Sequence, residues 1–162
     1  MRLRRELRQV RELQITVVGC GDDISSPHHG AKAYLAEHGA GEIPDANIHK
    51  IRRMGGIFTG QAFSNTPEEA SIVTGHLLKE IGGSIEFKDS TTIFICGHNP
   101  CAGCGSIGIE VDEQKRRLIE FGTTVHKLFG VPVVVLFEEH SHGNHYDVIA
   151  TFECEELVAD AA

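Results

Sequence analysis

Short apolar runs alternate along the chain with segments of helical periodicity, and turn-forming residues separate them. This alternation is typical of a mostly parallel sheet covered by helices. Two runs are almost continuously apolar, as expected of central strands buried on both faces. The last strand should be antiparallel to the fourth, because the turn before it is short. We therefore expect five strands, at residues 14–18, 48–52, 91–96, 133–137 and 145–152.

Capping residues mark the start of one helix. Thr66, Pro67 and Glu69 form an N-terminal signature in which side-chain atoms satisfy backbone amides that have no partner within the helix. Apolar residues follow at helical spacing, and Gly82 and Gly83 are expected to end the helix.

Two further helices are predicted. A shorter one should span residues 30–37, after the first strand. A longer one should begin at Asp112 and end at Gly130, with a buried side formed by Leu118, Val125 and Leu128.

The chain has 162 residues, of which 41% are hydrophobic, enough for one domain with a continuous core. No stretch approaches the roughly 18 apolar residues of a membrane-spanning helix, and the N-terminus carries arginines where a signal peptide needs an apolar core. We therefore expect a cytoplasmic protein without membrane contact. The net charge of -8 disfavours general nucleic-acid binding, which uses clustered positive charge.

Charge is spread unevenly along the chain. Residues 1–12 contain five arginines and two glutamates, so this end is basic while the remainder is acidic. We expect a basic helical arm at residues 1–13 and one domain at 14–162. A basic arm on an acidic body suggests that it packs on a second copy of the chain, in a homodimer. The alternative is a frayed, solvated terminal helix.

The cysteines point to metal or thiol chemistry. Their number, five, is odd, and Cys96, Cys101 and Cys104 lie within one short segment. This pattern favours a metal site or a reactive thiol in a reducing compartment over a disulfide framework.

Candidate zinc ligands follow the first and third predicted strands. In an open parallel sheet, ligands gather beyond the carboxyl ends of the strands, where the strand order reverses, so Cys20 can meet His98 and Cys101. Two sulfur atoms and one imidazole suit zinc. Three protein ligands leave the fourth tetrahedral position to water, as in catalytic zinc sites.

Three segments resemble the β-class carbonic anhydrases: Cys20-Gly-Asp22, Gly97-His-Asn-Pro-Cys101 and Asn144-His-Tyr-Asp147. The family has Cys-x-Asp-x-Arg after the first strand, Gly-His-x-x-Cys-Gly after the third and a Tyr-Asp strand near the end. The order and intervals match over roughly residues 14–157. The stretch from Arg52 to Gly56 also resembles the Arg-Asn-Ala-Gly sequence that ends the family's second strand.

The resemblance implies a three-layer α/β domain and a dimer. It also implies that Cys20, His98 and Cys101 bind a zinc ion (Zn2+) and that Asp22 is the active-site aspartate. Zinc-bound hydroxide would then convert carbon dioxide to bicarbonate, or act on a close analogue such as carbonyl sulfide. We therefore expect a zinc-dependent lyase.

One position departs from the family pattern. The family has an arginine two residues after the aspartate, where this chain has Ile24. Without that partner, the Asp22 carboxylate has an electrostatic reason to bind zinc and close the site. Arg52 or Arg53 can replace the missing arginine if either reaches. The alternative function is a zinc-binding homologue with little or no activity that acts as a binding or regulatory protein.

The cysteines also allow other readings. Cys20 can be a buried apolar residue, which would leave His98 and Cys101 short of ligands. Cys101 and Cys104 have the spacing of a redox dithiol. Cys96 is predicted to lie in the core.

The histidine-rich segments also allow more than one interpretation. His140, His142 and His145 can bind a second metal or form polar surface. His28 and His29 are expected on a loop, where they can shuttle protons or simply be solvated.

Overall fold

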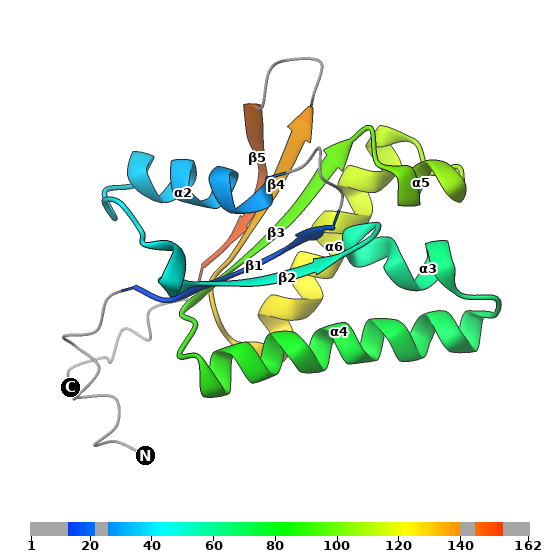
Figure 1. Ribbon diagram of the computed structural model, residues 1–162, viewed down its shortest axis with the longest axis horizontal. Helices are drawn as coiled ribbons and strands as arrows, with labels where there is room; N and C mark the ends of the chain where they lie inside the picture. Colours follow the sequence, from blue (N-terminus) through cyan, green and yellow to red (C-terminus); the bar gives the residue numbers. More distant parts are fainter. Residues whose placement is uncertain (1–12, 22–25, 140–144, 154–162) are drawn as a thin grey trace, which may run out of the picture.

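A computed structural model describes residues 13–21, 26–139 and 145–153. Five strands form one sheet in the order β2-β1-β3-β4-β5 (Figure 1). All neighbouring pairs are parallel except β4 and β5, which are antiparallel. The α/β fold with a mostly parallel five-strand sheet and an antiparallel last strand is therefore confirmed. The strands are β1 (Ile15–Cys20), β2 (Ile48–Arg53), β3 (Thr92–Asn99), β4 (Val133–Glu139) and β5 (His145–Phe152).

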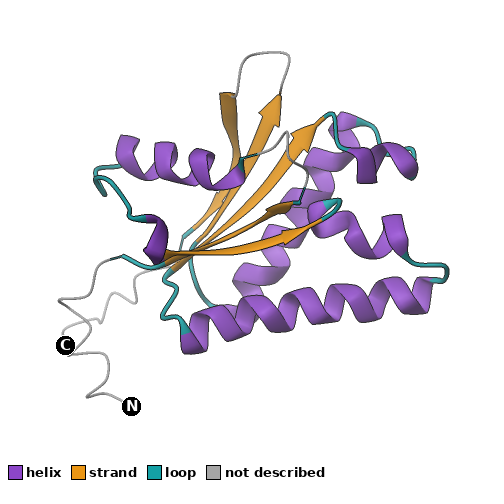
Figure 2. Cartoon of the chain, in the orientation of Figure 1, coloured by secondary structure: helices purple, strands orange, loops and turns teal. Residues whose placement is uncertain are grey.

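Helices cover both faces of the sheet (Figures 1 and 2). The helix α2 (Pro27–Glu37) lies on one face. The two long helices, α4 (Pro67–Phe87) and α6 (Val111–Phe129), lie on the other. None of the described helices is long and apolar enough to cross a membrane. The α-helices are α2 (Pro27–Glu37), α3 (Thr59–Phe63), α4 (Pro67–Phe87), α5 (Ala102–Ser106) and α6 (Val111–Phe129), and the 3-10 turns are η2 (Asp45–Asn47) and η3 (Gly56–Phe58).

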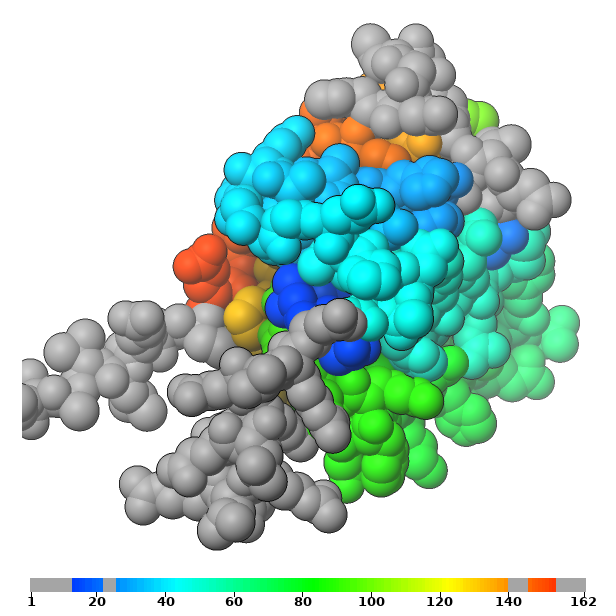
Figure 3. Space-filling model, turned by 60° about the vertical axis from the view of Figure 1, so that its left-hand side comes forward, coloured from blue at the N-terminus to red at the C-terminus, as the bar shows by residue number. Residues whose placement is uncertain are grey.

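The sheet separates two hydrophobic clusters. Side chains of a strand point alternately to its two faces. Val18 and Ile95 thus belong to the cluster under α4 and α6, here the α4/α6-side cluster. Val17 and Phe94 belong to the cluster under α2, here the α2-side cluster. In the space-filling view, only small areas of the segment coloured blue, which includes β1, remain visible between its neighbours (Figure 3).

The strand order reverses between β1 and β3. From β1 the chain continues to β2 on one side, and β3 and β4 follow on the other. The crossover from β1 includes α2 on one face of the sheet, and the crossover from β3 includes α6 on the other face. In open α/β sheets, ligand sites form at the carboxyl ends of the strands where the order reverses in this way. This is where the sequence placed the candidate zinc ligands.

The predicted end of α4 is wrong. The helix passes through Gly82 and Gly83 and continues to Phe87. A Cβ atom at position 82 would lie 2.9 Å from Cε1 of Phe129, the last residue of α6. Ser84, two residues after Gly82, is buried, and its hydroxyl accepts a hydrogen bond of 2.7 Å from Thr16 Oγ1. Gly82 therefore allows two helices to pack closely and does not terminate one of them.

The predicted end of α6 is correct, because Gly130 caps the helix in the left-handed conformation. Leu118 and Val125 are buried, as expected. Leu128, however, is 59% exposed, so its predicted burial is wrong. The buried stripe runs through Gly122 and Val125 to Phe129, which packs against the α4/α6-side cluster, and Leu128 lies one residue off this stripe.

Two helical glycines provide a matched test of the packing. A Cβ atom at Gly122 in α6 would lie 2.8 Å from Cγ2 of Val135 in β4, whereas Gly75 in α4 has no neighbouring atom within 4 Å. Gly75→Ala should raise the free energy of unfolding by about 0.5–1 kcal/mol, because alanine is the better helix former. Gly122→Ala should lower it by about 1–2 kcal/mol, because crowding outweighs that gain.

Urea denaturation of both variants and the wild type measures the difference. Equal stabilisation by the two substitutions would show that the approach of α6 to the sheet does not depend on Gly122.

Candidate metal centre

Three donor side chains meet where β1 and β3 end. Cys20 is the last residue of β1, His98 lies near the end of β3, and Cys101 directly precedes α5. Their ligand atoms all lie within 4.8 Å of one another, and all three residues are buried. The structure thus brings together the residues that the sequence singled out, in a cluster that could hold a metal ion.

The three donors reach this cluster from both faces of the sheet. Cys20 and Cys101 belong to the α4/α6-side cluster. His98 follows Cys96 by two residues in β3, and Cys96 belongs to the α2-side cluster. Strand alternation therefore directs the His98 side chain towards the α2 side.

The donor set suits zinc in chemistry and in spacing. Tetrahedral zinc with bonds of about 2.0–2.3 Å to nitrogen and sulfur holds its ligand atoms about 3.5–4 Å apart. The observed limit of 4.8 Å requires only small side-chain adjustments to reach this spacing. Within the described residues, Nε2 of His98 is buried and makes no hydrogen bond, although the residue has other interactions.

A glycine contact holds the two sulfur-bearing segments together. The Gly55 amide, in the turn after β2, donates a hydrogen bond of 3.2 Å to Sγ of Cys20. Gly55 has a positive φ of 79°, which favours glycine. A Cβ atom at Gly103 of α5 would lie only 2.6 Å from the Gly55 Cα, so the two backbones are in direct contact. The sequence analysis included Gly55 in the stretch that resembles the end of the family's second strand, but it missed the contact with Gly103.

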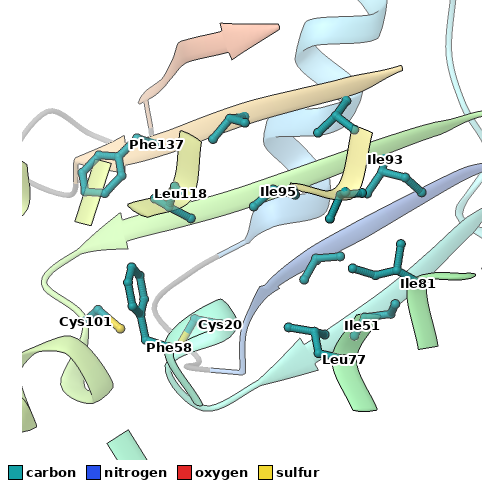
Figure 4. Packing of buried hydrophobic residues seen from close by; sticks show 14 of the residues in the cluster. Cys20, Ile51, Phe58, Leu77, Ile81, Ile93, Ile95, Cys101, Leu118 and Phe137 are labelled. Atoms are coloured by element: carbon teal, nitrogen blue, oxygen red, sulfur yellow. The ribbon is translucent and has the colours of Figure 1, made fainter. Parts of the chain in front are cut away.

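The cluster borders a very small cavity. The described residues enclose about 10 Å³, lined by the three donors together with Phe58 and Cys104. Figure 4 shows Cys20, Phe58 and Cys101 at the same end of the core. This volume is close to the minimum for one water molecule. Any group that reacts here without rearrangement of the walls must therefore be very small.

Two further cysteines lie nearby on opposite sides. Cys104 is buried, and the interaction between its thiol and that of Cys101 raises the pKa of Cys101 and lowers that of Cys104. It is not part of the three-donor cluster. Cys96 lies in the α2-side cluster, where burial raises the pKa of its thiol, so its predicted core position is confirmed.

The sequence analysis missed a buried carboxylate next to the centre. Glu138 pairs with His98 in the β3–β4 register and is only 1% exposed. The Tyr146 hydroxyl donates to Oε2 of Glu138 at 2.7 Å and accepts from the Ser26 amide at 3.2 Å. Burial is the main cause that raises the pKa of Tyr146, and the hydrogen bond to Glu138 is the second. The available signal was the pair of acidic residues, Glu138 and Glu139, directly after an apolar run.

Glu138 and Tyr146 also border a larger pocket. This pocket has a volume of about 280 Å³ and lies against α2, with His29 on its wall. His28 and His29 occupy the first turn of α2, so their predicted placement on a loop is wrong. Pro27 follows an N-cap at Ser26 and starts the helix before them. Burial lowers the pKa of His28.

Several predicted site residues lie outside the described residues. These are Asp22, Ile24, the turn histidines His140 and His142, and the basic arm at residues 1–12. The backbone of His145 is described as the first residue of β5. The roles assigned to these residues stay predictions.

The two arginines proposed to replace the missing one differ in their surroundings. Arg52 Nε donates to the backbone carbonyl of Cys20 at 3.1 Å, which places its guanidinium at the end of β1. Arg53 instead forms an ion pair with Glu80 of α4, at 2.5 Å. Arg52 is therefore the better placed of the two to approach the segment after Cys20.

Comparison with models of protein families gives no match, and comparison with curated protein sequences gives none either. Solved structures similar to this chain include a carbonic anhydrase from Streptococcus mutans, with a TM-score of 0.49 and 9% identity over 92% of both chains. They also include the β-carbonic anhydrase CafD of Aspergillus fumigatus, with a TM-score of 0.45 and 13% identity over 86% of this chain and 91% of that one.

A third similar structure is the Coccomyxa β-carbonic anhydrase in complex with acetazolamide, with a TM-score of 0.46 and 10% identity over 91% of this chain and 77% of that one.

Tyr146 provides a test of the polar network beside the centre. Tyr146→Phe should lower the free energy of unfolding by about 1–3 kcal/mol, because the buried Glu138 carboxylate loses a hydrogen bond. Tyr34→Phe is the control, since its hydroxyl makes neither of the two bonds. Denaturant titration near neutral pH measures both. Equal effects of the two changes would contradict a structural role for the Tyr146 hydroxyl.

Proposed function

We propose that this chain is a divergent β-class carbonic anhydrase, a zinc-dependent lyase that reversibly hydrates carbon dioxide or a close analogue such as carbonyl sulfide. The observation that supports the proposal is the buried convergence of Cys20, His98 and Cys101. These residues occupy the positions that the family motifs give to zinc ligands, and they lie at the strand-order reversal of the sheet.

The chain's own residues would bind the ion and shape its surroundings. Cys20, His98 and Cys101 would hold zinc, and the Gly55 amide would orient the Cys20 sulfur. When bound, zinc would supply the Lewis acidity that makes hydroxide available from water near neutral pH. Phe58, which lines the small cavity beside the donors, would present an apolar wall to a substrate such as carbon dioxide.

Asp22 would accept a hydrogen bond from the attacking water and orient it. With Ile24 in place of arginine, its carboxylate would also compete for the fourth zinc position. Arg52, bonded to the Cys20 carbonyl, is the residue we propose to oppose that competition. The absence of an arginine at position 24 also favours the second candidate function, a zinc-binding homologue with little or no activity.

Metal content is the first test. Protein purified without chelators should contain about one zinc ion per chain, and zinc should raise its melting temperature. Cys101→Ala should bind less than a tenth as much zinc, because a three-donor set loses one thiolate. Cys96→Ala, which removes a buried thiol that is not a donor, should keep full zinc content. Elemental analysis after gel filtration measures all three proteins, and a wild type without zinc would contradict the proposal.

The second test measures activity in variants of position 24 and of the two arginines at the end of β2. Stopped-flow hydration of carbon dioxide by the zinc-loaded wild type should be weak near neutral pH. Ile24→Arg should raise kcat/KM at least tenfold, because a guanidinium can hold the Asp22 carboxylate with two hydrogen bonds. Arg52→Ala should lower the activity of the wild type, whereas Arg53→Ala should not.

Other outcomes of this assay separate the alternatives. If zinc-loaded wild type and Ile24→Arg both match the uncatalysed rate, the lyase proposal is wrong and the binding or regulatory homologue is favoured. If the wild type is fully active and Arg52→Ala is not, Asp22 does not close the site.

A further inference from the structure

We propose that Cys101 and Cys104 form a reversible disulfide and that this bond removes Cys101 from the metal centre. The disulfide itself depends only on the two thiols. Its effect on metal binding rests on the zinc site of the proposed function. The feature that carries the inference is a second thiol that lines the same small cavity as a candidate ligand and lies outside the three-donor cluster.

The backbone between the two cysteines suits the bond. The Gly105 amide donates to the Cys101 carbonyl at 2.9 Å, so residues 101 to 105 form one α-helical turn. Residues three apart in such a turn have Cα atoms roughly 5 Å apart, within the range of about 4.4–6.8 Å found in disulfides. The two thiols also line the same small cavity. The bond therefore needs side-chain rotation and little movement of the backbone.

Cys104 is a better partner for Cys101 than Cys20 is, although Cys20 also contacts Cys101. The backbone of Cys20 is held in β1 by pairing with β2, and its sulfur accepts the Gly55 amide. Cys104 lies in the short helix α5, and Cys101 is the N-cap residue of that helix. Bond formation within this turn leaves the sheet unchanged.

The two thiols differ in solvent exposure, so we assign them different steps of the oxidation. Cys101 is 7% exposed and Cys104 only 1%, so a small peroxide meets Cys101 first. With hydrogen peroxide, the Cys101 sulfur attacks one oxygen and the O–O bond breaks, which gives a sulfenic acid and one water. The Cys104 sulfur then displaces the second water and forms the S–S bond. Two thiols are oxidised, one peroxide is reduced to two waters, and a dithiol reductant reverses the bond by exchange.

The disulfide would change the donor set. Zinc binds the thiolate form of cysteine, and a sulfur in a disulfide carries no such charge. Only Cys20 and His98 would remain of the three donors. Oxidation should therefore release the ion, and bound zinc should in turn slow oxidation because it occupies the Cys101 sulfur.

The test uses the full chain, reduced and prepared both metal-free and zinc-loaded. Metal-free protein treated with equimolar hydrogen peroxide should fall from five to three titratable thiols per chain in denaturant. Mass spectrometry of the alkylated digest should find Cys101 joined to Cys104. Zinc-loaded protein should react at least tenfold more slowly, release about one zinc per disulfide to a chromogenic chelator, and rebind it after reduction.

Cysteine variants distinguish the Cys101–Cys104 disulfide from general oxidation of the protein. Cys104→Ala should form no disulfide and should release zinc at least tenfold more slowly than wild type under peroxide, and Cys104→Ser serves as a second variant if the first is poorly folded. Cys96→Ala retains the pair and should behave as wild type. Absence of the bond in metal-free protein, a Cys20–Cys101 disulfide instead, or zinc retained after the bond forms would overturn the proposal. A protein that forms the bond but never binds zinc would support the dithiol and contradict the proposed function.

Discussion

The parallel pairing of β1 with β3 is the constraint on which the candidate centre depends. The two strands are far apart in sequence, but their register, with Val18 opposite Ile95, brings their carboxyl ends together. Both strands pack on both faces, so a slip of one residue would exchange the side chains that fill the α2-side and α4/α6-side clusters. The packing of these two clusters thus fixes the position of Cys20 relative to His98.

Backbone contact completes the arrangement. The Gly55–Gly103 approach places the turn after β2 against α5, and the Gly55 amide meets the Cys20 sulfur from that turn. Side chains at either glycine would separate the segments that carry Cys20 and Cys101. The region is therefore assembled from three strand ends and one short helix, with little space between them. Such a centre suits a very small substrate and tolerates little substitution in its walls.

The sequence predicted the architecture well because burial leaves a strong pattern. All five strands were found to within three residues at each end, and the strand-order reversal correctly predicted that Cys20 would meet His98 and Cys101. The errors arose where tertiary contacts override local signals. Gly82 looked like a helix end because its partner, Phe129, is distant in sequence, and Leu128 lies beside the buried stripe that the sheet selects. The Glu138–Tyr146 bond depends on the pairing of β4 with β5, which one strand alone does not reveal.

The approach of the donors from both faces of the sheet has a consequence for cooperativity. The sheet keeps the α2-side and α4/α6-side clusters apart, so each could loosen with limited effect on the other. An ion held by Cys20, His98 and Cys101 would connect the two, because a local opening on either side would break a metal bond. Amide hydrogens in α2 and in α6 would then gain protection from exchange together on metal binding. Three residues at the carboxyl ends of two interior strands would thus make two separate cores behave as one folding unit.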